Sequence, residues 1–341
     1  MENKKALKVL NPRSVWLPVV IGLSLIFYMA YRDDQLSLET LHLLSDFYLP
    51  FLLIIFLVAA IKDSLNAWRV RSISHNEMGV AHAFRIILLW EFAIAVTPPI
   101  IGAAAVLVFI IYKEGQPFGK ALAYTLLLAI LDNLFLLTSS PLAIWWSGGA
   151  VLPEVPAGTS IFEESLSHVF WLSYSSIVVY TSFMLSALLL FPKTIRKLMS
   201  GLMGIKMLSR WKAQVMKQSD ELILASQVLK GQSALYWLKL LAITYMVWIF
   251  KFAMVNIWVN GFAGIESGDQ LLMIGRHITM WVVMLVSPSP GNAGTAEFIY
   301  PVFYRDFAGS YTFVSSMLWR FSTYYPYLLI GVFLIPRWWK K

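Results

Sequence analysis

The hydrophobic residues of this chain are gathered in long blocks separated by short polar segments. A helix needs about 20 mostly apolar residues to cross the hydrocarbon core of a bilayer, and most of the blocks approach or exceed that length. This pattern predicts an all-α polytopic membrane protein. The blocks that we interpret as membrane-embedded cover residues 14–31, 47–61, 84–112, 121–146, 167–191, 234–259, 271–304 and 311–335.

Two of these blocks, 84–112 and 271–304, contain a helix-breaking segment near the middle. The first break holds the sequence Thr-Pro-Pro at 97–99, and the second is Ser-Pro-Ser-Pro-Gly-Asn-Ala-Gly at 287–294. Proline lacks an amide hydrogen and its ring clashes with the preceding turn, so each segment should end a helix. The freed backbone groups cannot face lipid, and we expect protein or a water-filled cavity to cover them. For the first break, a simple proline kink is the alternative.

The charges of the polar segments indicate which side of the membrane each segment faces. Segment 192–232 holds eight Lys or Arg against two acidic residues, and such an excess is typical of a cytoplasmic loop. Segments 32–46, 148–165 and 260–270 carry net negative charge and would then face outward. These assignments agree with one another only if each broken block enters the membrane and leaves it again on the side from which it entered. We therefore predict about six spanning helices and two oppositely oriented re-entrant helical hairpins, with both termini in the cytoplasm.

The order helix, broken hairpin, helix occurs twice, in residues 47–146 and again in residues 234–335, and the two copies run in opposite directions. Inverted repeats with interrupted helices at matching positions are the best sequence indication of a transport site near the middle of the bilayer. We accordingly treat residues 1–341 as one transmembrane domain, in which the basic segment 192–232 joins the two repeats.

Composition excludes several classes of protein. With 58% apolar residues, 13% charged residues and a mean hydropathy of +0.67, the chain differs from soluble domains, which carry about 25% charged residues. The net charge of +8 lies beside the apolar blocks, where it marks orientation and lipid contacts rather than nucleic-acid binding. There is no cysteine, and no phosphate-binding loop or zinc-protease motif occurs. We expect no catalysis, no cofactor, no metal and no nucleic-acid partner.

Ionisable residues inside membrane blocks are costly and mark functional or paired positions. Glu91, Asp132 and Lys251 lie well inside their blocks, and we expect them to have protein partners or a polar cavity. Arg320 is the best candidate for a phosphate clamp, because its guanidinium can donate paired hydrogen bonds to phosphate oxygens. Glu297 would either cap the half-helix after the second break, pair with Lys251 or Arg320, or gate a cationic headgroup.

The half-helix after each break would start with unpaired amide groups and a partial positive charge. Two such starts, near Ile100 and near Thr295, would point at the membrane centre from opposite sides, which suits an anionic group such as a phosphate. The predicted substrate-binding residues are Glu91, Thr97, Pro98, Asp132, Lys251, Pro290, Gly291, Asn292, Gly294, Thr295, Glu297 and Arg320.

The second break, read from Pro288 to Glu297 as Pro-Ser-Pro-Gly-Asn-Ala-Gly-Thr-Ala-Glu, resembles a known signature. It is similar to the Pro-Gly-Gly-x-Gly-x-x-Glu motif of the lysylphosphatidylglycerol synthase transmembrane region, a flippase-like family, with Asn292 at the second glycine. The similarity extends over nearly the whole chain. The resemblance implies lipid translocation between leaflets without lipid synthesis, because no soluble aminoacyl-transferase domain follows the last helix.

We expect the protein to move an anionic or zwitterionic phospholipid, or a related lipid, through a polar site at the midplane of the plasma (inner) membrane. The alternatives are a secondary transporter of a small soluble solute, which would share the repeat pattern, and a membrane-embedded lipid-modifying enzyme. Membrane lipids, chiefly anionic ones, are the expected partners, and copies of the chain could also form a homo-oligomer.

Overall fold

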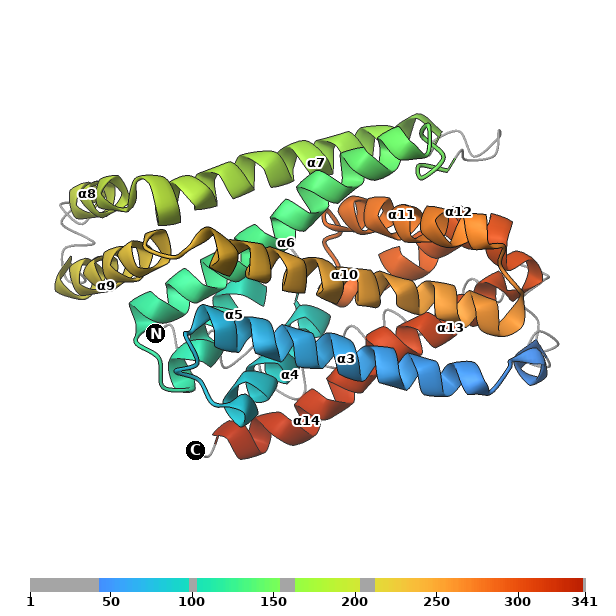
Figure 1. Ribbon diagram of the computed structural model, residues 1–341, viewed down its shortest axis with the longest axis horizontal. Helices are drawn as coiled ribbons and strands as arrows, with labels where there is room; N and C mark the ends of the chain where they lie inside the picture. Colours follow the sequence, from blue (N-terminus) through green and yellow to red (C-terminus); the bar gives the residue numbers. More distant parts are fainter. Residues whose placement is uncertain (1–42, 98–102, 154–162, 203–211, 340–341) are drawn as a thin grey trace.

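The computed structural model describes residues 43–97, 103–153, 163–202 and 212–339, and every regular element in these ranges is a helix. Figure 1 shows that the longest helices lie roughly along the long axis of the molecule. Of the described helices, four are long and apolar enough to cross a membrane: α3, α6, α10, and α7 with its continuation to Leu190. The predicted all-α membrane protein is thus confirmed at this level.

The helices follow the predicted blocks with a few changes. The blocks 121–146 and 234–259 are each one continuous helix, α6 and α10, whereas the block 14–31 lies outside the described residues. The block 167–191 is α7, which ends in a short π-helix, η4. The bounds are α3 Pro50–Ile73, α4 Val80–Val96, α5 Ala103–Lys113, α6 Phe118–Trp146, α7 Glu163–Leu185, η4 Ser186–Leu190, α8 Pro192–Leu202, α9 Lys212–Lys230, α10 Ala234–Phe262, α11 Ser267–Met284, η6 Pro290–Asn292, α12 Thr295–Ala308, η7 Gly309–Tyr311, α13 Thr312–Thr323 and α14 Tyr325–Trp339.

Helix α3 is longer than predicted and carries buried charges. The sequence pattern predicted that this block ends at residue 61, but the helix continues to Ile73. No proline or glycine occurs between Pro50 and residue 79, so the backbone has no reason to stop earlier. Lys62 and Arg69 lie two turns apart and are only 3% and 1% exposed. These two basic residues therefore belong to the interior of the helix bundle.

The last predicted block, 311–335, consists of two helices instead of one. α13 and α14 are separated by Tyr324, whose backbone is not helical (φ −128°, ψ −59°). Pro326 accounts for the break, because it has no amide hydrogen for the preceding turn and its ring would clash with the carbonyl group of residue 322. A third helix interruption thus joins the two that the sequence predicts.

Each of the two broken blocks folds into a helical hairpin. Arg85, near the start of α4, donates to the carboxylate of Glu114, just after α5, at 2.9 Å, so these two helices are antiparallel. Arg276 Nη1, in α11, donates to the carbonyl oxygen of Phe303, near the end of α12, at 2.9 Å. Both blocks therefore turn back along themselves, and neither is a single kinked helix.

Helices α3 and α10 form a central antiparallel pair. The amide of Tyr48 donates to the carbonyl oxygen of Gly261 at 2.8 Å at one end, and the Tyr236 hydroxyl donates to the Ser72 carbonyl oxygen at 3.5 Å at the other. Around this pair, α6 packs against α11, and α14 packs against α4. The last helix of the first repeat, α6, therefore contacts the hairpin of the second repeat, and the last helix of the second repeat, α14, contacts the hairpin of the first.

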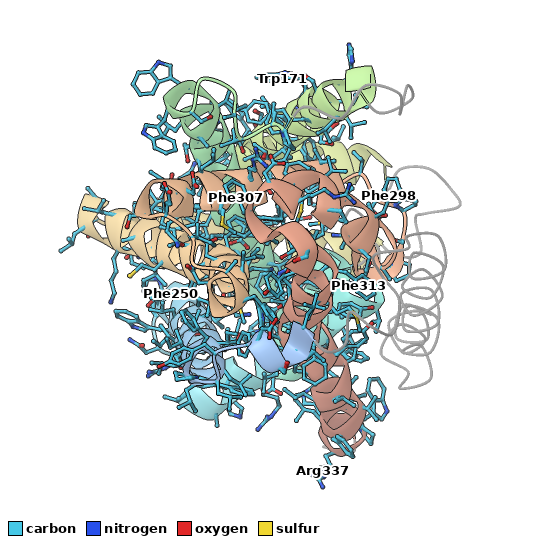
Figure 2. All side chains as sticks on the ribbon, turned by 90° about the vertical axis from the view of Figure 1, so that its right-hand side faces the viewer. Trp171, Phe250, Phe298, Phe307, Phe313 and Arg337 are labelled. Carbon is cyan, nitrogen blue, oxygen red and sulfur yellow. The ribbon has the colours of Figure 1, made fainter. Side chains whose placement is uncertain are left out.

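The outer surface of the helices is apolar. Figure 2 places Trp171 and Phe298 at the periphery, and these side chains are 48% and 46% exposed. Large exposed apolar side chains also follow the outer faces of α3 and α10: Leu53, Phe56, Leu57, Leu235, Leu238 and Ile249. Extended apolar patches are uncommon on soluble monomers, so this surface suits contact with lipid.

The segment 192–232, predicted as a basic cytoplasmic loop, contains two helices, α8 and α9, that pack against each other. Figure 1 shows them at one end of the molecule. Arg196 of α8 forms an ion pair with Asp220 of α9. The hydroxyl of Ser226 donates to the carbonyl oxygen of Leu188, which ties α9 to the end of the α7 segment.

Candidate functional site

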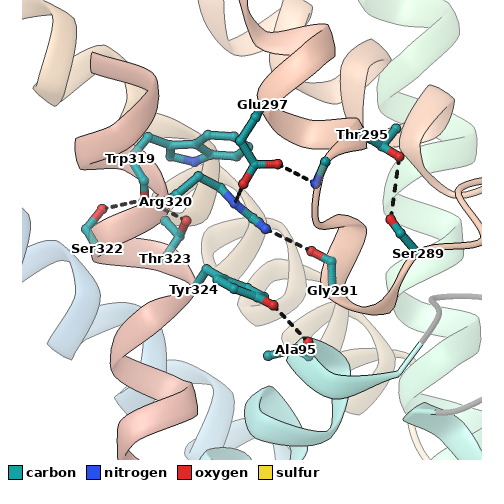
Figure 3. Close-up of polar contacts among 11 residues, drawn as sticks. Ala95, Ser289, Gly291, Thr295, Glu297, Trp319, Arg320, Ser322, Thr323 and Tyr324 are labelled. Carbon is teal, nitrogen blue, oxygen red and sulfur yellow. Dashed lines mark hydrogen bonds and ion pairs between the residues drawn. The ribbon is translucent and has the colours of Figure 1, made fainter. Parts of the chain in front are cut away.

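The three helix interruptions meet at one place. The amide of Gly291, in the break between α11 and α12, donates to the carbonyl oxygen of Thr97, which follows α4, at 3.1 Å. The hydroxyl of Tyr324, between α13 and α14, donates to the carbonyl oxygen of Ala95 at 3.2 Å (Figure 3). We call this place the hairpin junction, and it comprises residues 95–97, 287–297 and 319–324.

A buried ion pair stabilises the hairpin junction. The Glu297 carboxylate accepts from Arg320 Nε at 2.8 Å and from the amide of Gly294 at 2.7 Å. Arg320 Nη2 donates to the Gly291 carbonyl oxygen at 3.2 Å, and its guanidinium lies 3.9 Å from the centre of the Tyr324 ring (Figure 3). Two of the roles expected for Glu297, capping α12 and pairing with Arg320, are thus both observed.

The position of Glu297 affects anion binding at the start of α12. The amino end of a helix attracts anions through its free amides and partial positive charge. Here a carboxylate of the chain itself already binds the first of these amides. Arg320, predicted as a phosphate clamp, is directed at the same carboxylate and at a main-chain carbonyl. An external anion would have to compete with Glu297 for both groups.

Two glycines are required by the geometry of the second break. Gly291 and Gly294 have φ of +59° and +87°, in the left-handed region that residues with a Cβ avoid. A Cβ on Gly291 would also lie 2.5 Å from the carbonyl oxygen of Ala95. Asn292 has φ +55°, and asparagine tolerates this conformation better than most residues, which explains how it can stand at a glycine position of the signature.

Three hydroxyl groups gather beside the start of α12. Ser287 Oγ lies 2.8 Å from both Ser289 Oγ and Thr295 Oγ1, and it also accepts a hydrogen bond from the Ser289 amide. A hydroxyl can donate and accept, so this cluster satisfies part of the backbone that the break leaves without helical partners.

A second polar group lies between α3, α4 and α14. The Lys62 ammonium donates to Glu91 Oε1 at 2.9 Å and to the Tyr327 hydroxyl at 2.8 Å, and it lies 2.9 Å from Asp63 Oδ1. The Tyr327 hydroxyl donates in turn to the Asp63 carboxylate. Glu91, which the sequence predicted to need a partner, therefore has one in Lys62.

Asp132 also has a partner that the sequence did not reveal. The Arg69 guanidinium forms an ion pair with the Asp132 carboxylate, and the indole N–H of Trp248 donates to the same carboxylate at 2.9 Å. Arg69 donates further to the hydroxyl of Thr244 at 3.3 Å. These bonds join α3, α6 and α10 in the interior of the bundle.

Lys251 differs from the other interior charges. Its ammonium lies 4.2 Å from the centre of the Trp281 ring and 4.9 Å from that of Trp248. Among the described residues, no carboxylate is within ion-pairing distance of it, although Glu91 and Asp132 act on it from farther away. We call these interior ionisable residues the charged core: Lys62, Asp63, Arg69, Glu91, Asp132 and Lys251.

The predicted site residues therefore fall into two groups. The hairpin junction contains Thr97, Pro290, Gly291, Asn292, Gly294, Thr295, Glu297 and Arg320, the charged core contains Glu91, Asp132 and Lys251, and Pro98 lies outside the described residues. Sequence reasoning missed Lys62 and Arg69. The sequence did contain an indication of them. The two residues are seven positions apart with no proline or glycine between them, so one helix would carry both on the same face.

The acidic residues of both groups are bound to cations or amides. Glu91, Asp132 and Glu297 each contact a lysine or an arginine. Within the described ranges, no three His, Asp or Glu side chains are grouped as a metal ion would require. The two groups therefore place paired charges inside a bundle with an apolar exterior.

Comparisons with known proteins agree with the resemblance seen in the second break. No match was found among curated proteins or among solved structures. The family model described as the lysylphosphatidylglycerol synthase TM region matches residues 15–331, a range that includes both hairpins, the hairpin junction and the charged core. The chain belongs to the lysylphosphatidylglycerol synthase transmembrane-region family.

Proposed function

We propose that this protein moves a phospholipid, or a related lipid with an anionic or zwitterionic headgroup, from one leaflet of the membrane to the other. The headgroup would pass through the charged core while the acyl chains stay in the bilayer. Membership in a family of lipid-handling membrane proteins supports the proposal. The observation that carries it is Lys251, an interior ammonium without an ion-paired carboxylate among the described residues.

An unpaired interior cation is costly, because it has lost water without gaining a counter-charge. The two indole rings beside Lys251 offset part of this cost, since a desolvated cation–π contact contributes about 2 kcal/mol. A lipid phosphate would supply the missing negative charge. Lys62 and Arg69 are already paired with Glu91 and Asp132, so Lys251 is the favoured first contact for an anionic headgroup.

The paired charges nearby would then guide the headgroup onward. Lys62 and Arg69 each hold a carboxylate that a phosphate could replace one oxygen at a time. In such an exchange the cationic donors stay hydrogen-bonded, and Asp132, once displaced, still accepts from the indole N–H of Trp248. The charged core would therefore offer further positions to a headgroup after its first contact with Lys251.

The membrane arrangement that we propose has six spanning helices and two re-entrant hairpins in an inverted repeat. It is supported by the antiparallel pair α3 and α10, by the two hairpins α4–α5 and α11–α12, and by the matching contacts of α6 with α11 and α14 with α4. Both termini would face the cytoplasm of a plasma membrane, because the basic segment 192–232 favours that side.

Lys251→Met should slow lipid exchange by about tenfold or more, because a charge-assisted hydrogen bond contributes about 1.5–3 kcal/mol. The measurement uses the purified protein in liposomes that contain a trace of fluorescent anionic phospholipid. A membrane-impermeant reductant bleaches the outer leaflet, and the rate at which inner-leaflet fluorescence is lost reports translocation. Lys251→Arg keeps the charge and should retain part of the rate.

Lys239→Met is the matched control, because Lys239 lies on the same helix but is exposed, with its ammonium 4.8 Å from the centre of the Trp68 ring. This variant should exchange lipid at the normal rate. A Lys251→Met protein that is as stable and as fast as the unmodified chain would contradict the proposal. Efflux of soluble glycerophosphate without lipid exchange would point to a solute transporter instead.

A further inference from the structure

Helix α8 begins almost where a candidate membrane span ends. The span 166–190 closes with η4, and α8 starts at Pro192. The amide of Phe191 donates to the Ser186 carbonyl oxygen at 2.8 Å, so the connection is hydrogen-bonded. Two residues extend the chain by about 8 Å at most. The start of α8 is therefore held close to the membrane surface.

Helix α8 has no acidic residue, and both acidic residues of α9 make contacts within the protein. Asp220 forms an ion pair with Arg196. Glu221 accepts a hydrogen bond of 2.9 Å from the amide of Gly119, in the first turn of α6. Four exposed lysines of the two helices have no carboxylate within ion-pairing distance among the described residues: Lys193, Lys197, Lys217 and Lys230. Because Asp220 pairs with Arg196 and Glu221 is the one other acidic residue of the two helices, the four lysines leave α8 and α9 with a net positive charge.

One face of α8 combines this charge with apolar surface. Thr194, Lys197, Leu198 and Gly201 line a shared hollow, and their spacing of three and four residues places them in line along the helix. Leu198 is 59% exposed, and a Cβ on Gly201 would meet no atom of the described residues within 4 Å. We call these four residues the α8 face. Lysines that flank exposed leucines are typical of helices that lie at a membrane interface.

We propose that the α8 face binds the headgroups of anionic phospholipids in the adjacent leaflet, at a place separate from the charged core. Lys197 and the neighbouring Lys193 would contact the phosphate groups, and Leu198 would enter the boundary of the acyl chains. The open side of Gly201 leaves room for a headgroup. This inference concerns a binding surface and holds whether or not the protein translocates lipid.

A lipid is favoured over a soluble acidic protein for two reasons. The short connection to α7 keeps the α8 face next to the leaflet, where lipid headgroups are always present. Leu198, beside the lysines, offers apolar area that an acyl chain can cover, whereas a purely acidic partner would need only charge. Each lysine near an anionic surface strengthens binding by about fivefold, so a few lysines suffice.

The test uses the absence of cysteine in the chain, because a single Thr194→Cys substitution allows a fluorophore to be placed on the α8 face of the full-length protein. Quenching by phospholipids that carry a spin label near the headgroup then measures contact. We expect stronger quenching in vesicles of phosphatidylcholine with phosphatidylglycerol than in phosphatidylcholine alone. The difference should vanish in about 1 M salt, where charges are screened beyond about 3 Å.

The labelled protein then receives the double variant Lys193→Glu with Lys197→Glu, which should weaken its binding to phosphatidylglycerol headgroups by more than about tenfold. The double variant Lys193→Arg with Lys197→Arg should keep this binding. Arg337→Glu is the matched control, since Arg337 is exposed near the carboxyl end of α14, and α14 ends at the same end of the molecule as α8 (Figure 1). Quenching as strong in phosphatidylcholine vesicles as in vesicles with phosphatidylglycerol would overturn the proposal. A loss of phosphatidylglycerol binding in Arg337→Glu as large as in the double lysine variant would overturn it too. A response to polyglutamate but not to anionic vesicles would assign the face to an acidic protein.

Discussion

Replacing Arg320 with methionine should lower the free energy of unfolding by about 3–5 kcal/mol, the usual cost of removing one partner from a buried ion pair. The substitution keeps the apolar stem but leaves the Glu297 carboxylate, 3% exposed, with the Gly294 amide as its one remaining partner among the described residues. The same change removes the bond to the Gly291 carbonyl oxygen. Unfolding by sodium dodecyl sulfate in mixed micelles, followed by circular dichroism, measures the loss.

Two controls separate the ion pair from general damage. Glu297→Gln combined with Arg320→Met should recover much of the stability, because no unpaired charge is left in the interior. The side chains of the ion pair between Lys120 and Glu77 are 37% and 46% exposed, and Lys120→Met should therefore cost less than about 1 kcal/mol. Equal midpoints for Arg320→Met and Lys120→Met would show that the buried pair does not hold the hairpin junction.

Replacing Gly291 with alanine should separate the two hairpin tips. The new Cβ would lie 2.5 Å from the carbonyl oxygen of Ala95 and 2.4 Å from the Tyr324 ring, at a backbone φ of +59°. The ring can rotate away, but the carbonyl group belongs to the backbone of α4, so the break itself must move. We expect a cost of about 1–3 kcal/mol from overpacking, in addition to the strain of a left-handed alanine.

Gly148 provides the matched control for this strain. Its φ is +61°, nearly the same as that of Gly291, but a Cβ there would meet nothing within 4 Å. Gly148→Ala should therefore show only the conformational cost of about 1–2 kcal/mol. The difference between the two unfolding free energies isolates the contact between the tips. A difference near zero would mean that the second break can shift without disturbing the first.

The main-chain features of the site could be predicted from the sequence. Proline and glycine act on the backbone of their own neighbourhood, so the two breaks follow from local residues. That each broken block turns back was inferred instead from the charges of the segments beside it. The cap formed by Glu297 is local in the same sense, since it lies three residues after Gly294. The family signature lies in this segment as well.

The pairing of charges could not be predicted in the same way. Lys62 and Arg69 bind carboxylates that lie 29 and 63 positions later in the chain, and no local pattern specifies such a distant contact. A basic residue just after an apolar block is typical of the end of a membrane span, so Lys62 was not expected in the interior. The carboxylates Glu91 and Asp132 indicated only that some partner had to exist.

The hydrogen bond between the Gly291 amide and the Thr97 carbonyl oxygen joins main chain to main chain. Because it uses no side chain, changes of residue type at position 97 leave it available, and only a shift of the backbone removes it. If either hairpin slides along its axis, it must break this bond or pull the opposite tip with it. As long as this bond persists, a displacement of one hairpin tip therefore also displaces the other tip.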